Sequence, residues 1–186
     1  MLVSGADVNA SSNTGHTCLM AAVYNRHPNV VRELIQRQAN INEQRHDGAT
    51  ALHIAGMICH TDIVGILLDN GAYPNIRDNK GYTPLQCASC EGRLDIIRKL
   101  ISGELDNISR AIMLLQHRVI FQGVSSTALE IACSYGHTDI VAFVQEVLVK
   151  LQDDIRNNQS SGTVLCVDNG TDSQWRHRTT GGPWTY

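Results

Sequence analysis

Apolar residues recur along the chain in short stripes with helical spacing. Residues 30–35, 63–68 and 96–101 each carry apolar side chains at their first, second, fifth and sixth positions. Side chains at i, i+1, i+4 and i+5 lie on one side of an α-helix, so each stripe predicts a helix that packs on its neighbours. The stripes are 33 residues apart (63 − 30 and 96 − 63), which indicates a repeated structural unit.

Small and polar positions keep the same period. Thr17, Thr50 and Thr83 are separated by 33 residues (50 − 17 and 83 − 50). The same step links Gly15, Gly48 and Gly81, Leu19, Leu52 and Leu85, Ala22, Ala55 and Ala88, and Asn9, Asn42 and Asn75. Self-similarity at this period marks a repeat array, in which no unit can bury its apolar faces alone. The best-preserved copy lies at residues 48–75.

This unit resembles the ankyrin repeat. The shared features are a Gly-x-Thr-Pro-Leu-His-x-Ala start, a Gly-His in the middle and a Gly-Ala-Asp-Val-Asn end, and they cover about residues 2–103 and 125–149. The resemblance implies an all-α fold, namely an ankyrin-like repeat solenoid of helix-turn-helix units with short hairpin turns. It also implies a non-catalytic protein-protein interaction module that binds a partner protein through its concave face.

The repeats divide most of the chain into three parts. Residues 1–11 hold the end of a truncated repeat, GADVN, without the helices that should precede it. We therefore expect the chain to be a fragment or an isoform of a longer protein. Residues 12–103 hold three ankyrin-like repeats, and residues 123–156 hold a fourth, terminating repeat with polar residues opposite its apolar stripe.

The period breaks between the third and fourth repeats. Thr127 follows Thr83 by 44 residues (127 − 83) rather than 33. We assign the extra residues to a helical insertion at residues 104–122, where apolar residues at steps of three or four predict an amphipathic helix over about residues 106–117. This helix is either a structural spacer packed on the array or a dedicated docking element.

The end of the chain has a different composition. Residues 157–186 are rich in Asn, Gln, Ser, Thr and Gly and contain no repeat motif. Such a segment cannot bury enough surface to offset its chain entropy, so we expect a disordered tail. The tail contains Trp175 and Trp184, which this composition does not explain.

Individual residues mark where the predicted helices begin and end. Thr17 can cap a first helix, because its hydroxyl can accept from an unpaired amide. Pro28 fits the first turn of the second helix, where its missing N–H has no cost. Gln38 stands where the repeat has Gly, although a left-handed backbone there suits Gly better than Gln.

Composition narrows the class of protein. The formal net charge of −3 argues against general affinity for nucleic acid, because phosphate binding needs a basic surface. No apolar run is long enough to cross a bilayer, and no secretory signal is visible at the N-terminus. The six cysteines lack a disulfide-framework spacing. We therefore expect reduced thiols, a cytoplasmic or nuclear location and no membrane partner.

Candidate chemistry is sparse. Cys87 and Cys90 form the only close cysteine pair, but a structural zinc site usually needs four ligands, and a redox Cys-x-x-Cys needs a βαβ setting. We find no phosphate-cradling glycine loop and no nucleophile motif, so we expect no enzyme activity, no cofactor and no metal site. A thiol or zinc protein that uses the two cysteines remains the alternative of that class.

The ankyrin resemblance also implies where a partner binds. In that family, partners usually meet the hairpin tips and the exposed side of the first helix of each repeat. Transferred by phase, these positions are His16, Tyr24, Asn25, His46, Asp47, Met57, Ile58, Asn79, Lys80, Tyr82, Glu91 and Tyr135. Met57 and Ile58 are apolar where polar residues are usual. They either form an apolar strip with the three tyrosines or pack against the neighbouring repeats.

The expected partner is another protein, and we expect the chain to act as a monomer or as part of a larger complex. The alternative function is a regulatory or substrate-recruiting ankyrin fragment of a larger enzyme or of a ubiquitin-ligase adaptor.

Overall fold

The computed structural model describes residues 7–58, 60–102, 108–121 and 123–160. Residues 1–6 of the truncated repeat lie outside the described residues, and so does the predicted tail from residue 161 onwards, including both tryptophans.

Short helices in pairs make up most of the described chain, and a small β-hairpin precedes the last pair. In chain order the elements are α1 (Cys18–Tyr24), α2 (Pro28–Gln36), α3 (Ala51–Ile58), α4 (Thr61–Asp69), α5 (Pro84–Cys90), α6 (Leu94–Ser102), α7 (Ile108–Gln116), β1 (Val119–Phe121), β2 (Val124–Ser126), α8 (Ala128–Ser134) and α9 (Thr138–Ser160).

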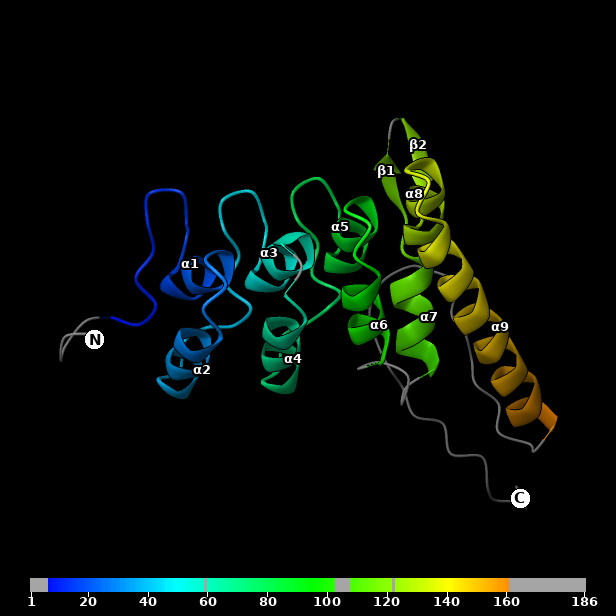
Figure 1. The fold of residues 1–186 in the computed structure, drawn as a ribbon, viewed down its shortest axis with the longest axis horizontal. Helices are drawn as coiled ribbons and strands as arrows, with labels where there is room; N and C mark the ends of the chain where they lie inside the picture. The colour runs from blue at the N-terminus through cyan, green and yellow to red at the C-terminus, as the bar shows by residue number, and fades with distance from the viewer. Residues whose placement is uncertain (1–6, 59, 103–107, 122, 161–186) are drawn as a thin grey trace, which may run out of the picture.

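The helices stack in two layers. In Figure 1 the first helices of the repeats, α1, α3, α5 and α8, follow one another along the molecule, and α2, α4 and α6 form a second layer beside them. Loops project from the first layer in a common direction. This arrangement confirms the predicted all-α repeat solenoid. We call the side formed by these loops and the exposed surface of α1, α3, α5 and α8 the concave face, as expected of a solenoid.

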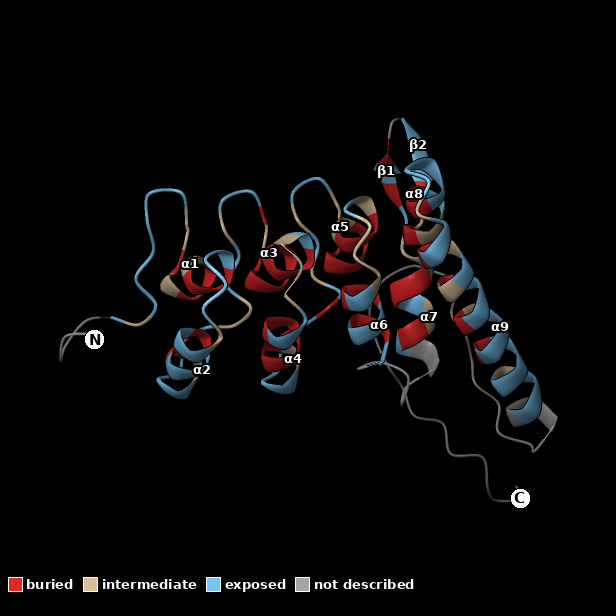
Figure 2. Ribbon diagram, viewed as in Figure 1, coloured by how far each residue is buried: buried red, intermediate tan, exposed pale blue. Residues whose placement is uncertain are grey.

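The core is a continuous ribbon between the layers and between neighbouring repeats. Leu19, Leu52 and Leu85 occupy the same position in three repeats, and each is 2% exposed or less. Figure 2 shows the buried residues on the sides of the helices that face other helices. One cluster of buried side chains extends from α1 to Leu151 in α9. Each repeat therefore completes the core of the next.

Threonine side chains begin the first helices. The Thr17 hydroxyl accepts from the Met20 N–H at 3.2 Å, as predicted from its place in the repeat. Thr83 and Gln86 form a reciprocal capping box, and Thr127 and Glu130 form another. These bonds satisfy amides that have no partner inside the helix, so they fix the residue at which each helix starts.

The periodic asparagines link the ends of neighbouring repeats. The Asn9 side-chain oxygen accepts from the Asn40 N–H at 2.7 Å, and Asn42 accepts from the Tyr73 N–H at 2.8 Å. Each bond joins the end of one repeat to the end of the next. The spacing of these residues therefore reflects a structural role.

Gln38 adopts the left-handed conformation that its position predicts. Its φ is +65°, and Gly71, one repeat later, has φ +89°. A side chain is disfavoured in this region because its Cβ approaches the following carbonyl. Gln38 thus adopts the left-handed backbone conformation that the turn after α2 requires, at a local energetic cost.

The insertion contributes a helix and a hairpin. α7 packs on α8 and α9, and its bounds are close to those of the predicted helix at residues 106–117. The hairpin β1–β2 follows and leads into α8. α9 continues to Ser160, so residues 157–160, which the composition placed in the tail, belong to this helix. Its exposed side carries Gln145, Glu146, Gln152 and Asp153, the polar face expected at the end of an array.

Replacing Leu52 tests the assignment of the repeat core. We expect Leu52→Ala to lower the free energy of unfolding by about 2–5 kcal/mol, because the truncation leaves a cavity between repeats. Urea unfolding followed by circular dichroism measures this change. Val149→Ala, which alters an apolar side chain that is 56% exposed, should change it by less than about 0.5 kcal/mol. Unchanged helicity and melting in Leu52→Ala would contradict the assignment.

Replacing Gln38 should, in contrast, raise the free energy of unfolding. We expect Gln38→Gly to raise the free energy of unfolding by up to about 1 kcal/mol, since glycine avoids the steric cost of a left-handed residue but loses more chain entropy. Thermal unfolding compares it with Gln36→Gly, a matched change within α2 that should be destabilising by roughly 0.5–1 kcal/mol. A Gln38→Gly protein that is less stable than the wild type would show that the Gln38 side chain stabilises the turn.

Candidate functional site

The loops on the concave face are short and internally bonded. Backbone hydrogen bonds join Ser12 N–H to His16 O at 3.0 Å, Arg45 N–H to Ala49 O at 2.9 Å and Asp78 N–H to Tyr82 O at 2.9 Å. We call residues 12–16, 45–49 and 78–82 the finger loops. Six of the predicted contact residues lie in them: His16, His46, Asp47, Asn79, Lys80 and Tyr82.

Neighbouring finger loops are also bonded to each other. The His46 N–H donates to Thr14 O at 3.1 Å, and the Asn79 N–H donates to Asp47 O at 2.8 Å. The Asn79 side-chain amide donates to His46 O at 2.8 Å. Asn79 is therefore partly a structural residue. These bonds hold the loops in a row, so their exposed side chains keep fixed positions relative to one another.

His53 joins the second repeat to the third beneath the loops. The Thr50 N–H donates to His53 Nδ1 at 3.1 Å, so Nδ1 must be unprotonated. Nε2 then carries the hydrogen and donates to Tyr82 O at 3.0 Å. The ring is almost wholly buried, and this burial lowers the pKa of His53. The neutral tautomer is thus the form that the fold requires.

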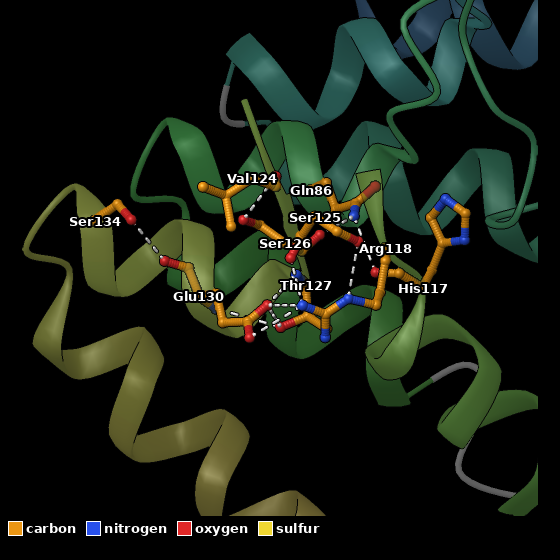
Figure 3. A network of polar contacts seen from close by, with 9 residues as sticks. All are labelled: Gln86, His117, Arg118, Val124, Ser125, Ser126, Thr127, Glu130 and Ser134. Carbon is orange, nitrogen blue, oxygen red and sulfur yellow. Dashed lines mark hydrogen bonds and ion pairs between the residues drawn. The ribbon is translucent and has the colours of Figure 1, made fainter. Parts of the chain in front are cut away.

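Gln86 fills the same position one repeat later. Its Nε2 donates to His117 O at 3.0 Å, and its Oε1 accepts from the Thr83 N–H at 3.0 Å. Figure 3 shows this side chain beneath the base of the hairpin, where it also reaches Ser126 O at 3.5 Å. The link between repeats is therefore kept across the insertion.

Glu130 and Arg118 hold the hairpin to α8 (Figure 3). A Glu130 carboxylate oxygen accepts from the Thr127 N–H at 2.6 Å, and Arg118 lies 3.2 Å from the same carboxylate. Arg118 also donates to the backbone oxygen and the hydroxyl of Ser125. The Thr127 amide is the main reason that the pKa of Glu130 is lowered. The base of the hairpin is thereby fixed to the start of α8.

The hairpin covers part of the concave face. Val119 and Phe121 of β1 are buried against Ile131 of α8, and Tyr82 and Cys90 pack against the same cluster. The Phe121 ring lies 5.5 Å from the Tyr135 ring. The hairpin therefore occupies the concave side of α5 and α8, where the resemblance places partner contacts.

Apart from Tyr135, whose ring lies beside Phe121 of the hairpin, two of the predicted apolar side chains on this face stay exposed. Tyr24 is 63% exposed and Met57 is 48% exposed. They occupy the same repeat position as Cys90 (57 − 24 and 90 − 57 both equal 33). Ile58 instead is half-buried and packs against the main core. Of the two apolar residues predicted together, only Met57 thus presents a large exposed surface.

The other predicted residues divide by exposure. Asn25, His46, Asp47, Asn79, Lys80, Glu91 and Tyr135 are exposed, whereas His16 and Tyr82 are half-buried. Asn25 ends α1 and donates from its side chain to Ala21 O at 2.8 Å. Arg45 donates to Asp47 at 2.8 Å and lowers the pKa of that carboxyl to about 2. Asp47 is therefore ionised and paired on the surface.

The cysteine pair lacks reactive thiolates. Burial raises the pKa of Cys87 to about 12 and that of Cys90 to about 11, so both thiols stay protonated at neutral pH. Within residues 7–58, 60–102, 108–121 and 123–160, no group of three or more His, Cys, Asp or Glu side chains is placed to hold a metal ion.

A shallow depression lies away from the concave face. It has a volume of about 320 Å³, is lined by Arg32, Asp62, Asp69 and Lys99 among others, and opens between α2, α4 and α6. Its charges are of both signs.

As for the bilayer, none of the helices in the described ranges has the length and apolar character that a crossing requires.

Comparison with protein families identifies the repeats. The family model for ankyrin repeats, in three copies, matches residues 1–78 and 38–111, which together exceed half of the chain. The chain belongs to the ankyrin-repeat family. No curated protein matches it at a significant level. Ankyrin repeats are generally protein-interaction modules and are typically non-catalytic.

The ankyrin-repeat consensus did not reveal the hairpin. The sequence contains a weak signal for it: Val119-Ile120-Phe121 is rich in strand-forming residues, and Gly123 precedes a second short run. Each strand has only three residues, and Val119 also fits the helical spacing of the insertion. Sequence reasoning therefore missed Val119 and Phe121 as residues of the concave face.

His53 makes the stability of the ankyrin repeats depend on pH. The folded state lowers its pKa below the value of about 6.5 typical of an unfolded chain, so the unfolded chain binds more protons as the pH falls through that value. The free energy of unfolding should consequently decrease below about pH 6.5. Urea unfolding at several pH values between neutral and mildly acidic measures this slope.

His53→Gln provides the control, because Gln86 already makes the equivalent bonds in the next repeat. The variant should fold and show a weaker pH dependence. The pKa of His117 is also lowered by burial, so part of the slope should remain. An identical slope in the variant and the wild type would exclude His53 as its cause.

Proposed function

We propose that the chain recognises a partner protein through its concave face, with Tyr24 and Met57 as the central contacts. The observation that carries this proposal is the exposure of these two apolar side chains at the same position of adjacent repeats. Large aromatic side chains often contribute most of the binding energy at protein interfaces, and Met adapts to irregular partner surfaces.

The surroundings of the two residues suit an interface. Exposed polar side chains lie on the same face, including Asn25, His46 and Lys80, and can supply the hydrogen-bonding rim that surrounds an apolar centre. The bonds between finger loops fix the backbone in advance, which reduces the entropy lost on binding. The partner that fits this arrangement is a protein with an apolar segment and few charges.

Capture from cell lysate tests the proposal. We compare wild type with the double variant Tyr24→Ala, Met57→Ser, and quantify each captured protein. Truncating a central contact costs about 1–2 kcal/mol or more, so the double variant should bind its partner at least about tenfold more weakly. Circular dichroism checks that the variant folds, as expected for changes at exposed positions.

Met113→Ser is the matched control. Met113 is 61% exposed on α7, in the outer layer and away from the concave face. A partner that is retained by Met113→Ser and lost by the double variant supports the proposal. A partner that both variants retain would place the binding surface elsewhere on the chain.

A further inference from the structure

The third repeat shows how this chain covers an apolar position on its own concave face. Cys90 is partly buried against the cluster that Ile131 forms with two alternate side chains of β1, Val119 and Phe121. Alternate residues of a strand point to the same side, so both side chains face the helices. The equivalent positions in the first two repeats, Tyr24 and Met57, have no such cover among the described residues.

The same chain carries a second segment with this alternation. Trp184-Thr185-Tyr186 has aromatic residues at alternate positions, and all three residue types favour extended structure. Another apolar run, at residues 163–167, begins only three residues after α9 ends (163 − 160). Three residues are too few to let that run return along the 23-residue helix α9.

The length of the chain allows the aromatic segment to reach the first two repeats. α9 has 23 residues and ends on the side of the molecule where α2 and α4 lie (Figure 1). A return along it covers about 34 Å. Three further steps between packed repeats, from the fourth to the first, add about 30 Å.

The two tryptophans differ in reach. Trp184 follows Ser160 by 24 residues (184 − 160), which span up to about 79 Å when extended. This exceeds the path of about 64 Å to Tyr24. Trp175 follows by 15 residues (175 − 160) and spans about 50–54 Å when extended, which leaves no spare length over the path of about 54 Å to Met57. Only the segment that ends in Trp184 has length to spare for this route.

We infer that Trp184 and Tyr186 bind over Tyr24 and Met57 of the same chain, as Val119 and Phe121 bind over Cys90. The connection within one chain gives the segment an effective concentration on the order of millimolar, so a weak contact is sufficient to populate the bound form. The inference rests on the proposed function where it concerns regulation: the segment and the partner protein compete for one surface.

Intrinsic fluorescence tests this contact directly, because Trp175 and Trp184 are the only tryptophans in the chain. In a Trp175→Phe background every tryptophan signal comes from Trp184. We expect blue-shifted emission and several-fold weaker acrylamide quenching than in urea, independent of protein concentration. Adding Tyr24→Ala and Met57→Ser should restore the emission and quenching of an exposed indole, whereas adding Met113→Ser should not.

The remaining outcomes overturn the inference. The inference fails if Trp184 is quenched in the folded chain as strongly as in urea, if it stays shielded in the Tyr24→Ala, Met57→Ser background, or if it becomes more shielded as protein concentration rises. The first result excludes docking, the second places the contact elsewhere, and the third assigns it to a second copy of the chain. The Trp184→Phe chain, in which Trp175 alone reports, should show an exposed indole.

This experiment is separate from the capture of a partner. An exposed Trp184 together with partner capture that depends on Tyr24 and Met57 would leave the proposed function intact and reject the inference. A shielded Trp184 together with partner capture that does not depend on Tyr24 and Met57 would support the inference and reject the proposed function. When both hold, Trp184→Ala with Tyr186→Ala should increase partner capture, because the competing segment is weakened.

Discussion

Burial between neighbouring repeats is the constraint on which the rest of the structure depends. Leu52 and Ile63 are 2% and 0% exposed, although a single two-helix unit has too little interior to bury them. The next unit supplies the missing cover. The polar links have the same origin, because a buried polar group needs a partner. His53 bonds a backbone oxygen in the next repeat, and Gln86 bonds one in the insertion that follows its repeat. Substitutions between units should therefore matter more than those on exposed faces.

The insertion shows how the array accommodates a break in its period. α8 packs on α5 in the first layer, as in the regular repeats, while α7 adds a helix that packs on α8 and α9. The extra residues thus change the outer side and the loop region and leave the inner stack intact. Gln86 spans the break by bonding His117 O, and Arg118 with Glu130 secures the hairpin that replaces a finger loop.

The hairpin determines which part of the concave face stays available. By packing on Cys90 and Tyr82 it removes apolar surface from the third repeat, so the exposed apolar side chains of the face are Tyr24 and Met57 in the first two repeats and Tyr135 beside the hairpin. The hairpin also carries its own exposed apolar residues: Ile120, on the side away from this contact, and Val124, which pairs with Phe121. The exposed apolar surface of the face is consequently uneven along the array, although the repeats are alike in sequence.

The sequence by itself determined the fold class, the phase of the repeats, the starts of the helices at Thr17 and Thr83, and the left-handed turn at Gln38. These features depend on residues close together in the chain and on a period that recurs, so local physics is sufficient to predict them. The phase also located the twelve candidate contact residues on finger loops and helix ends.

Only the tertiary structure decided which of these residues are exposed. Exposure of Met57 and burial of Ile58 depend on neighbouring repeats, and Tyr82 is covered by Val119 and Phe121, which lie far along the sequence. The hairpin itself belongs to this second group. A pair of three-residue strands is not stable alone, and it forms here because α5 and α8 provide the surface on which it packs.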